Sequence, residues 1–160
     1  EYPKISLACI STHELPTLVG WWAGSDIELR AKNGRQTEEA SARDIQIRQQ
    51  DLRALLEALY HENLLPVEDA GVSSGESDVP GFSEELAIAI HRFGARTKSL
   101  MFAVQMEDIL LSPRQPNLPG TTEEYPNWRI RLEVPVEDLA LDPRFQKIAR
   151  ALREERPSIS

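Results

Sequence analysis

Two short apolar runs, separated by a long stretch of mostly helical pattern, constrain how this chain can fold. The first run covers residues 4–10 and the second covers residues 100–105. Short runs of mainly apolar residues such as these are typical of strands buried in a parallel sheet. Parallel strands need a long crossover between them, and the intervening residues can supply it. We therefore predict an α/β fold in which polar loops follow the carboxyl ends of two paired strands.

The residues between the two runs carry clear helix signals. Residues 38–62 hold neither Gly nor Pro, and their leucines recur at three- and four-residue steps, which predicts one long helix with an apolar face. Ser83 followed by two acids predicts the start of another helix, with Gly94 as its end. Residues 86–90 also alternate as a strand would, so that alternative stays open.

Two further helices are predicted from their ends, and one segment is predicted to be a loop. The Ser-x-x-Glu pattern at Ser25 starts a short helix that Asn33-Gly34 stops. Asp142-Pro143 starts the last helix, whose apolar stripe runs to about Glu155. Residues 66–81 combine Pro, Gly, Ser and acids with no base, so we expect a flexible surface loop there.

Composition excludes several classes of partner. The chain has 26 acidic and 18 basic residues, a net charge of −8, which disfavours nucleic acid because phosphate binding needs clustered Lys and Arg. No stretch reaches the roughly 18 apolar residues of a membrane span, and we expect no membrane partner. The single cysteine, Cys9, allows no internal disulfide and is expected to be a small buried hydrophobe. The cytoplasm is the expected location.

A polar loop directly behind the first apolar run carries the residues best suited to chemistry. It reads Ser11-Thr-His-Glu-Leu-Pro-Thr-Leu-Val-Gly-Trp-Trp22. On its own, a His-Glu pair such as His13-Glu14 is more often a solvated loop pair than a site. Neither this pair nor His61-Glu62 continues as His-Glu-x-x-His, so a zinc site is disfavoured. His61 suits the carboxyl end of the long helix.

This loop and two later segments resemble the amylomaltases, which are 4-alpha-glucanotransferases of glycoside hydrolase family 77. The family pattern reads Thr-His-Asp-Leu-Pro-Thr before an aromatic pair, with Glu14 at the Asp position here. Residues 115–121 and 124–129 resemble the family's Asn-x-Pro-Gly-Thr and Pro-Asn-Trp signatures. Residues 99–108 resemble its eighth strand and the acidic turn that follows.

The resemblance implies the carboxy-terminal portion of a (β/α)8 TIM barrel, with strands 7 and 8 and their helices. A complete barrel needs about 250 residues, so this chain of 160 is expected to be a single segment, residues 1–160, of a longer enzyme. It would be mostly helical with few strands. Its partners would be the upstream remainder of the barrel, maltooligosaccharides and glucose.

The resemblance also implies roles for individual residues. Glu14 takes the place of the acid that stabilises the transition state, and His13 binds sugar hydroxyls beside it. Asn117 and Trp22 are expected to contact substrate, although Asn117 also fits a local turn and Trp22 a packing anchor. Trp128 is expected to be structural. Glu107 and Asp108 are expected to be capping or loop acids.

The implied function is a 4-alpha-glucanotransferase that transfers α-1,4-glucan segments between maltodextrins and glucose through a covalent glucosyl-enzyme. The resemblance implies that this chemistry needs no metal or organic cofactor. The family's nucleophile and its acid/base lie upstream of this chain, so the chain would supply part of the active-site wall and no turnover of its own. A non-catalytic α-glucan-binding or interaction module is the alternative. A trehalose-forming or hydrolytic relative would lack the Asn-x-Pro-Gly-Thr and Pro-Asn-Trp signatures.

Overall fold

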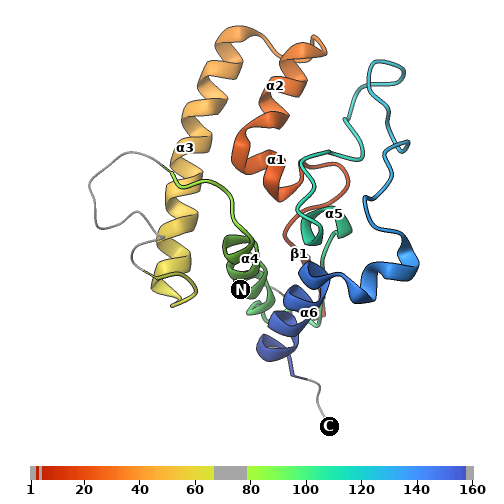
Figure 1. Cartoon of the computed structure of the whole chain (residues 1–160). Helices are drawn as coiled ribbons and strands as arrows, with labels where there is room; N and C mark the ends of the chain where they lie inside the picture. The colour runs from red at the N-terminus through yellow and green to blue at the C-terminus, as the bar shows by residue number, and fades with distance from the viewer. Residues whose placement is uncertain (1–2, 4, 67–78, 158–160) are drawn as a thin grey trace.

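The computed structural model describes residues 3, 5–66 and 79–157, and helices dominate this part of the chain (Figure 1). The elements in chain order are β1 Leu7–Cys9, α1 Leu18–Ala23, α2 Ser25–Lys32, α3 Glu38–His61, α4 Glu84–Ala95, β2 Met101–Ala103, α5 Met106–Ile109, the 3-10 helix η1 Val136–Leu141 and α6 Pro143–Glu155. The expected α/β composition, mostly helical with few strands, is confirmed for the described residues. No helix among them combines the length and apolar character that a membrane crossing requires.

The two strands pair as predicted but are shorter and far more exposed than expected. β1 and β2 run parallel, with Leu7 opposite Met101 and Cys9 opposite Ala103. Position 4 of the predicted first run lies outside the described residues. Leu7 and Met101 are each 57% exposed, so the expectation of buried strands is wrong for the described chain. Cys9 shares the exposed face with Leu7, because alternate residues of a strand point the same way, and its predicted burial is also wrong.

The long helix α3 forms where the sequence predicts it and buries one stripe against α1 and α4. Thr37 caps its start by accepting a hydrogen bond from the Ala40 amide at 3.2 Å. Leu59 is fully buried in the hydrophobic core between these helices. The core residues are Leu18, Trp22, Leu52, Leu56, Leu59, Leu65, Leu86, Ala89 and Ile90.

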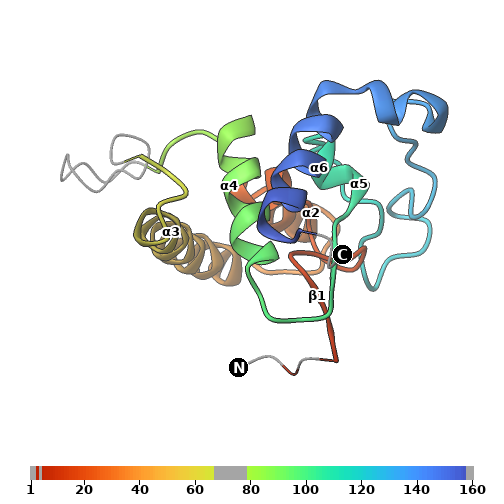
Figure 2. The ribbon, with the colours of Figure 1, turned by 90° about the horizontal axis from the view of Figure 1, so that it is seen from below.

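Helix α4 lies between α3 and α6 (Figure 2) and settles the choice between helix and strand for residues 86–90. Ser83 caps it through the Leu86 amide at 3.1 Å, as predicted. Gly94 does not end the helix, which continues to Ala95. A Cβ at Gly94 would lie 2.7 Å from the ring of Phe102, so this glycine instead permits close packing of α4 on β2.

Two corrections concern helix starts. The sequence predicts no helix before Ser25, yet α1 begins at Leu18, because the Thr17 side chain accepts the Gly20 amide at 3.1 Å. Ser25 belongs to α2 itself, and Gly24 in a left-handed conformation precedes that helix. Within the segment predicted to be a flexible loop, residues 67–78 lie outside the described residues.

Helix α6 starts at the predicted Asp142 cap and fastens the end of α4. Asp142 accepts the Arg144 amide at 2.8 Å. Arg156, just beyond α6, donates to the carbonyls of Ala95 and Thr97 at 2.9 Å each, to that of Leu100 at 3.1 Å, and to that of Ser99. One guanidinium therefore holds the whole connection between α4 and β2.

Candidate functional site

The loop after β1 is a tight turn whose two ends are joined by a hydrogen bond. The Leu15 amide donates to the Thr12 carbonyl at 2.9 Å, which closes a turn with His13 and Glu14 at its tip. The buried Ser11 hydroxyl donates to the Pro16 carbonyl at 2.9 Å and joins the two ends of the loop. Both tip side chains are more than half exposed, so they are available to a ligand.

The second loop of the site, residues 115–128, follows α5 and is held together by one amide. Asn127 accepts the Leu118 amide at 2.8 Å and donates to the Thr121 carbonyl at 3.0 Å and its hydroxyl at 2.8 Å. The Trp128 amide donates to the Pro116 carbonyl at 3.0 Å. Asn127 thereby joins the two motifs of this loop, one containing Asn117 and the other Trp128.

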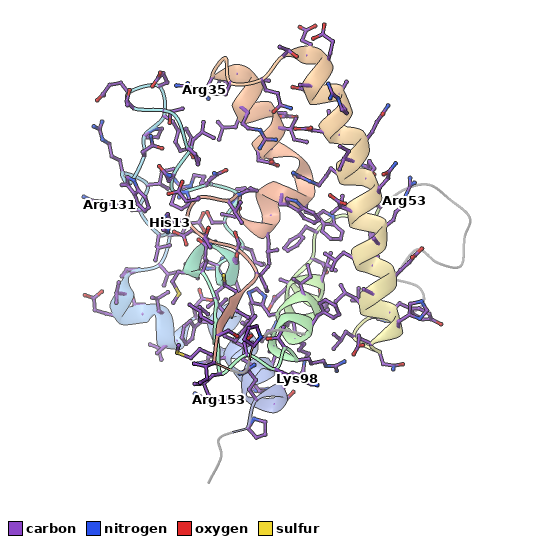
Figure 3. All side chains as sticks on the ribbon, turned by 180° about the vertical axis from the view of Figure 1, so that it is seen from behind. His13, Arg35, Arg53, Lys98, Arg131 and Arg153 are labelled. Carbon is purple, nitrogen blue, oxygen red and sulfur yellow. The ribbon has the colours of Figure 1, made fainter. Side chains whose placement is uncertain are left out.

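The two loops meet in a group of four side chains, His13, Glu14, Asn117 and Trp128, which we call the site cluster. One Glu14 carboxylate oxygen lies 3.2 Å from His13 Nε2, and the other accepts a hydrogen bond from Asn117 Nδ2 at 3.1 Å. The rings of His13 and Trp128 have centroids 5.1 Å apart. In Figure 3, His13 projects from the loop after β1 toward the loops that follow β2.

The site cluster combines groups that suit a neutral, hydroxyl-rich ligand. A carboxylate accepts hydrogen bonds, an amide both donates and accepts, and an imidazole can do either. Trp128 is 64% exposed and offers a flat apolar face beside them. Within the described residues, no three His, Cys, Asp or Glu side chains gather as a metal site would require.

The four residues singled out from the sequence do not all lie together. His13, Glu14 and Asn117 share the site cluster, whereas Trp22 is 7% exposed in the hydrophobic core. Its indole N–H donates to the Pro80 carbonyl at 2.8 Å and its ring meets Phe82 edge-on. This burial favours the packing role that the sequence left open for Trp22.

Trp128 is the functional candidate that sequence reasoning assigned to packing. Its backbone φ is 61°, a left-handed conformation that is uncommon for a bulky residue and is found at sites held by their surroundings. The Pro-Asn-Trp motif marked the residue, but only its exposure and its contact with His13 reveal a place in the site.

Beneath the loop after β1, the carboxylate of Asp108 is buried, with 1% of the residue exposed. It accepts a hydrogen bond from the Leu18 amide at 2.7 Å, so it caps α1 from a different element. Burial raises the pKa of Asp108 to about 6, helped by the charge of Glu107 and opposed by the Leu18 hydrogen bond. The sequence-based view of a capping acid agrees with this contact, although the helix that it caps was not predicted.

Comparison with known proteins finds the same family throughout. The model of the 4-alpha-glucanotransferase family matches residues 1–137. The 4-alpha-glucanotransferase of Mycobacterium tuberculosis is 34% identical over 159 residues, covering 96% of this chain and 20% of that protein. The Haemophilus influenzae 4-alpha-glucanotransferase is 32% identical over 136 residues, or 85% of this chain and 19% of its relative.

A solved structure supports the same grouping. The crystal structure of amylomaltase from Corynebacterium glutamicum superposes with a TM-score of 0.82 at 30% identity and covers 95% of this chain. The match takes in 22% of that amylomaltase. The chain thus spans about a fifth of the length of the curated relatives it matches.

Proposed function

Because this chain belongs to the 4-alpha-glucanotransferase family, we propose that it is the carboxy-terminal segment of an enzyme that transfers α-1,4-glucan segments between maltodextrins and glucose. The transfer would proceed with retention through a covalent glucosyl-enzyme. The observation that carries the proposal is the site cluster, in which two loops that follow paired parallel strands bring together His13, Glu14 and Asn117. Barrel enzymes place their chemistry at the carboxyl ends of such strands.

Each member of the site cluster has a chemical role in this proposal. Glu14 stabilises the positive charge that develops on the reacting sugar in the transition state. His13 and Asn117 hydrogen-bond sugar hydroxyls, and the exposed face of Trp128 stacks on a glucose ring. Trp22 packs α1 into the core and so holds the helix that follows the loop of His13 and Glu14.

The remainder of the enzyme would supply the nucleophile, the acid/base and the cover for the exposed face of this chain. The strand pair β1 and β2 would be strands 7 and 8 of a (β/α)8 barrel, and upstream strands and helices would pack against them. An apolar groove of about 350 Å³, lined by Ile10, Leu15, Trp21, Leu55, Ile90 and Phe93, supports such a contact. The exposed side chains of Leu7 and Met101 support it too, because large apolar patches mark interfaces.

A non-catalytic α-glucan-binding module remains the second candidate. The site cluster forms within this chain alone and is open to solvent, which favours sugar binding without the rest of a barrel. The two candidates differ in one measurable property, since only the first predicts turnover when the chain is joined to catalytic residues.

The test is a chimaera in which this chain replaces the matching segment of the Corynebacterium glutamicum amylomaltase, assayed for glucose release from maltotriose. The chimaera should be active, whereas the 160-residue chain alone should release no glucose. Glu14→Gln is the matched control, because it keeps the shape of the side chain and removes the charge, and it should abolish most of the activity. An inactive chimaera whose chain still binds maltotriose would support the binding module instead.

Glu14 itself allows a sharper prediction, because the family has Asp at this position. The extra methylene moves the carboxylate by on the order of 1 Å, and a misplacement of that size can cost about 10²-fold in rate. In this structure the longer side chain also occupies the Asn117 amide. We expect Glu14→Asp to raise the turnover of the chimaera. Asn117→Ala is the comparison, because it removes the hydrogen bond to Glu14 and leaves the length of the Glu14 side chain unchanged. An unchanged or lower rate in Glu14→Asp would contradict the misplacement.

A further inference from the structure

Asp108 is a buried ionisable group that the proposed chemistry does not use. It lies on α5, and its Oδ1 accepts the amide of Leu18, a residue 90 positions away in the sequence, at 2.7 Å. Leu18 is the first residue of α1, where the helix offers no partner of its own to an amide. The Asp108 carboxylate therefore satisfies the first amide of α1, while the Thr17 side chain caps the third.

The start of α1 is rigidly connected to the site cluster. Between Leu18 and Glu14 the chain contains Pro16, and the Ser11 hydroxyl binds the Pro16 carbonyl at 2.9 Å. The turn from Thr12 to Leu15 then carries His13 and Glu14. A shift of the Leu18 amide would consequently move both tip side chains.

The same post-strand region holds the other half of the site cluster. Asp108 precedes the loop of residues 115–128 on the same stretch of chain, and this loop supplies Asn117 and Trp128. Arg144 of α6 steadies the region by donating to the Leu110 carbonyl at 2.7 Å. Two hydrogen bonds, from Leu18 to Asp108 and from Asn117 to Glu14, thus join the two sides of the site.

We propose that Asp108 is a positioning residue for glucan transfer, which holds the turn of His13 and Glu14 in register with Asn117 and Trp128 through the Leu18 amide. This inference rests on the proposed function. It assigns to Asp108 no contact with sugar and no proton transfer.

The charge state of Asp108 provides a specific readout. Burial, opposed by the Leu18 hydrogen bond and helped by the charge of Glu107 on the same helix, raises its pKa to about 6, so the carboxylate protonates as the pH falls below that value. Arg144 of α6 binds the Leu110 carbonyl, two residues beyond Asp108, and pairs its charge with Asp142. A protonated carboxyl accepts a hydrogen bond less strongly than a carboxylate does, so the anchor weakens at low pH.

The experiment uses the active chimaera with Asp108→Leu, Asp108→Asn and, as matched control, Glu107→Gln. Asp108→Leu should lower kcat by about tenfold or more, with a smaller change in KM and no matching fall in melting temperature. Asp108→Asn keeps an acceptor, so it should retain most of kcat at neutral pH and lose the inflection of the kcat profile near pH 6. Glu107→Gln should leave kcat unchanged.

Three results would overturn the proposal: an unchanged kcat in Asp108→Leu, parallel losses of kcat and melting temperature in that variant, or an unchanged pH inflection in Asp108→Asn. If the parent chimaera is inactive, the proposed function fails while the positioning role is still measurable. In the 160-residue chain carrying His13→Gln, which removes the imidazole from the turn, the Leu18 and Leu15 amide signals in NMR spectra should shift together near pH 6, and Asp108→Asn should abolish that shared shift. Independent behaviour of the two signals would refute the coupling.

Discussion

The hydrophobic core and the site cluster are built in different ways. The core is a set of buried apolar side chains from α1, α3 and α4, led by the fully buried Leu59. The site cluster is exposed and is held by hydrogen bonds between segments far apart in sequence, such as Asn117 to Glu14. The core therefore determines whether the chain folds, and a few polar contacts determine where the side chains of the site cluster lie.

The largest expected effect is a loss of stability from the core alone. Leu59→Ala should reduce the free energy of unfolding by about 2–5 kcal/mol, because the cavity left by a buried leucine collapses only partly. Urea denaturation of the 160-residue chain measures this. The matched control is Leu141→Ala, since Leu141 is 73% exposed and its truncation should change stability by less than about 0.5 kcal/mol. The folded Leu59→Ala variant should keep its affinity for maltotriose. A large change in affinity would contradict the separate roles of the core and the site cluster.

An effect of intermediate size, with a pH signature, is expected at Asp108, which lies between the two regions. Its pKa of about 6 in the folded chain is above that of an unfolded aspartate, so the folded state binds more protons between about pH 4 and 6. Stability should therefore be full below this window and fall as the pH rises through it, by on the order of 3 kcal/mol. Asp108→Asn should remove the slope and leave the chain more stable at neutral pH.

Asp26 supplies the comparison of opposite sign for that measurement. Burial alone would raise the pKa of Asp26, but the hydrogen bonds and charges of Arg48 and Arg30 outweigh it and lower the pKa. Its contribution to stability is present above the unfolded pKa and is lost as the pH falls through the folded value. The two variants Asp26→Asn and Asp108→Asn should change the pH dependence of the melting temperature in opposite directions. A change in the same direction would contradict both assignments.

The smallest effect on stability is expected from Trp128. Trp128→Ala should change the free energy of unfolding by less than about 0.5 kcal/mol, because the side chain is mostly exposed. It should weaken maltotriose binding by roughly tenfold, the loss expected for an aromatic contact of about 1.4 kcal/mol. Calorimetric titration measures the affinity. Trp22→Ala is the paired control and should show the reverse pattern, with stability reduced by about 3–5 kcal/mol.

The fold was predictable wherever the signal is local. Helix α3 follows from a repeat of leucines and the absence of Gly and Pro, and α6 follows from its Asp142 cap, both of which lie within a few residues. Helix α1 was missed because its six residues are too few to show a periodic pattern, and Asp108, which binds its first amide, is brought there by the tertiary fold. The exposure of Cys9 was missed because burial of a strand depends on what covers it.

Three of the four residues of the site cluster were predictable, but their arrangement was not. The resemblance to a family pointed to His13, Glu14 and Asn117, but no pattern in the sequence indicates that Glu14 bonds both of the others. That contact requires Asn127 to fold the loop of residues 115–128 into one shape. The place of Trp128 beside His13 depends on the same loop.

The guanidinium of Arg156 has a consequence for how this chain can be shortened. The family match ends at residue 137, which suggests a natural point for truncation. Arg156 nevertheless holds the carbonyls that connect α4 to β2, including those of Ala95 and Leu100. A chain that ended at residue 137 would lack Arg156, so these carbonyls would bind water instead. The start of β2 would then lose the hydrogen bonds that hold it. The smallest unit that keeps this strand in place therefore extends to residue 156.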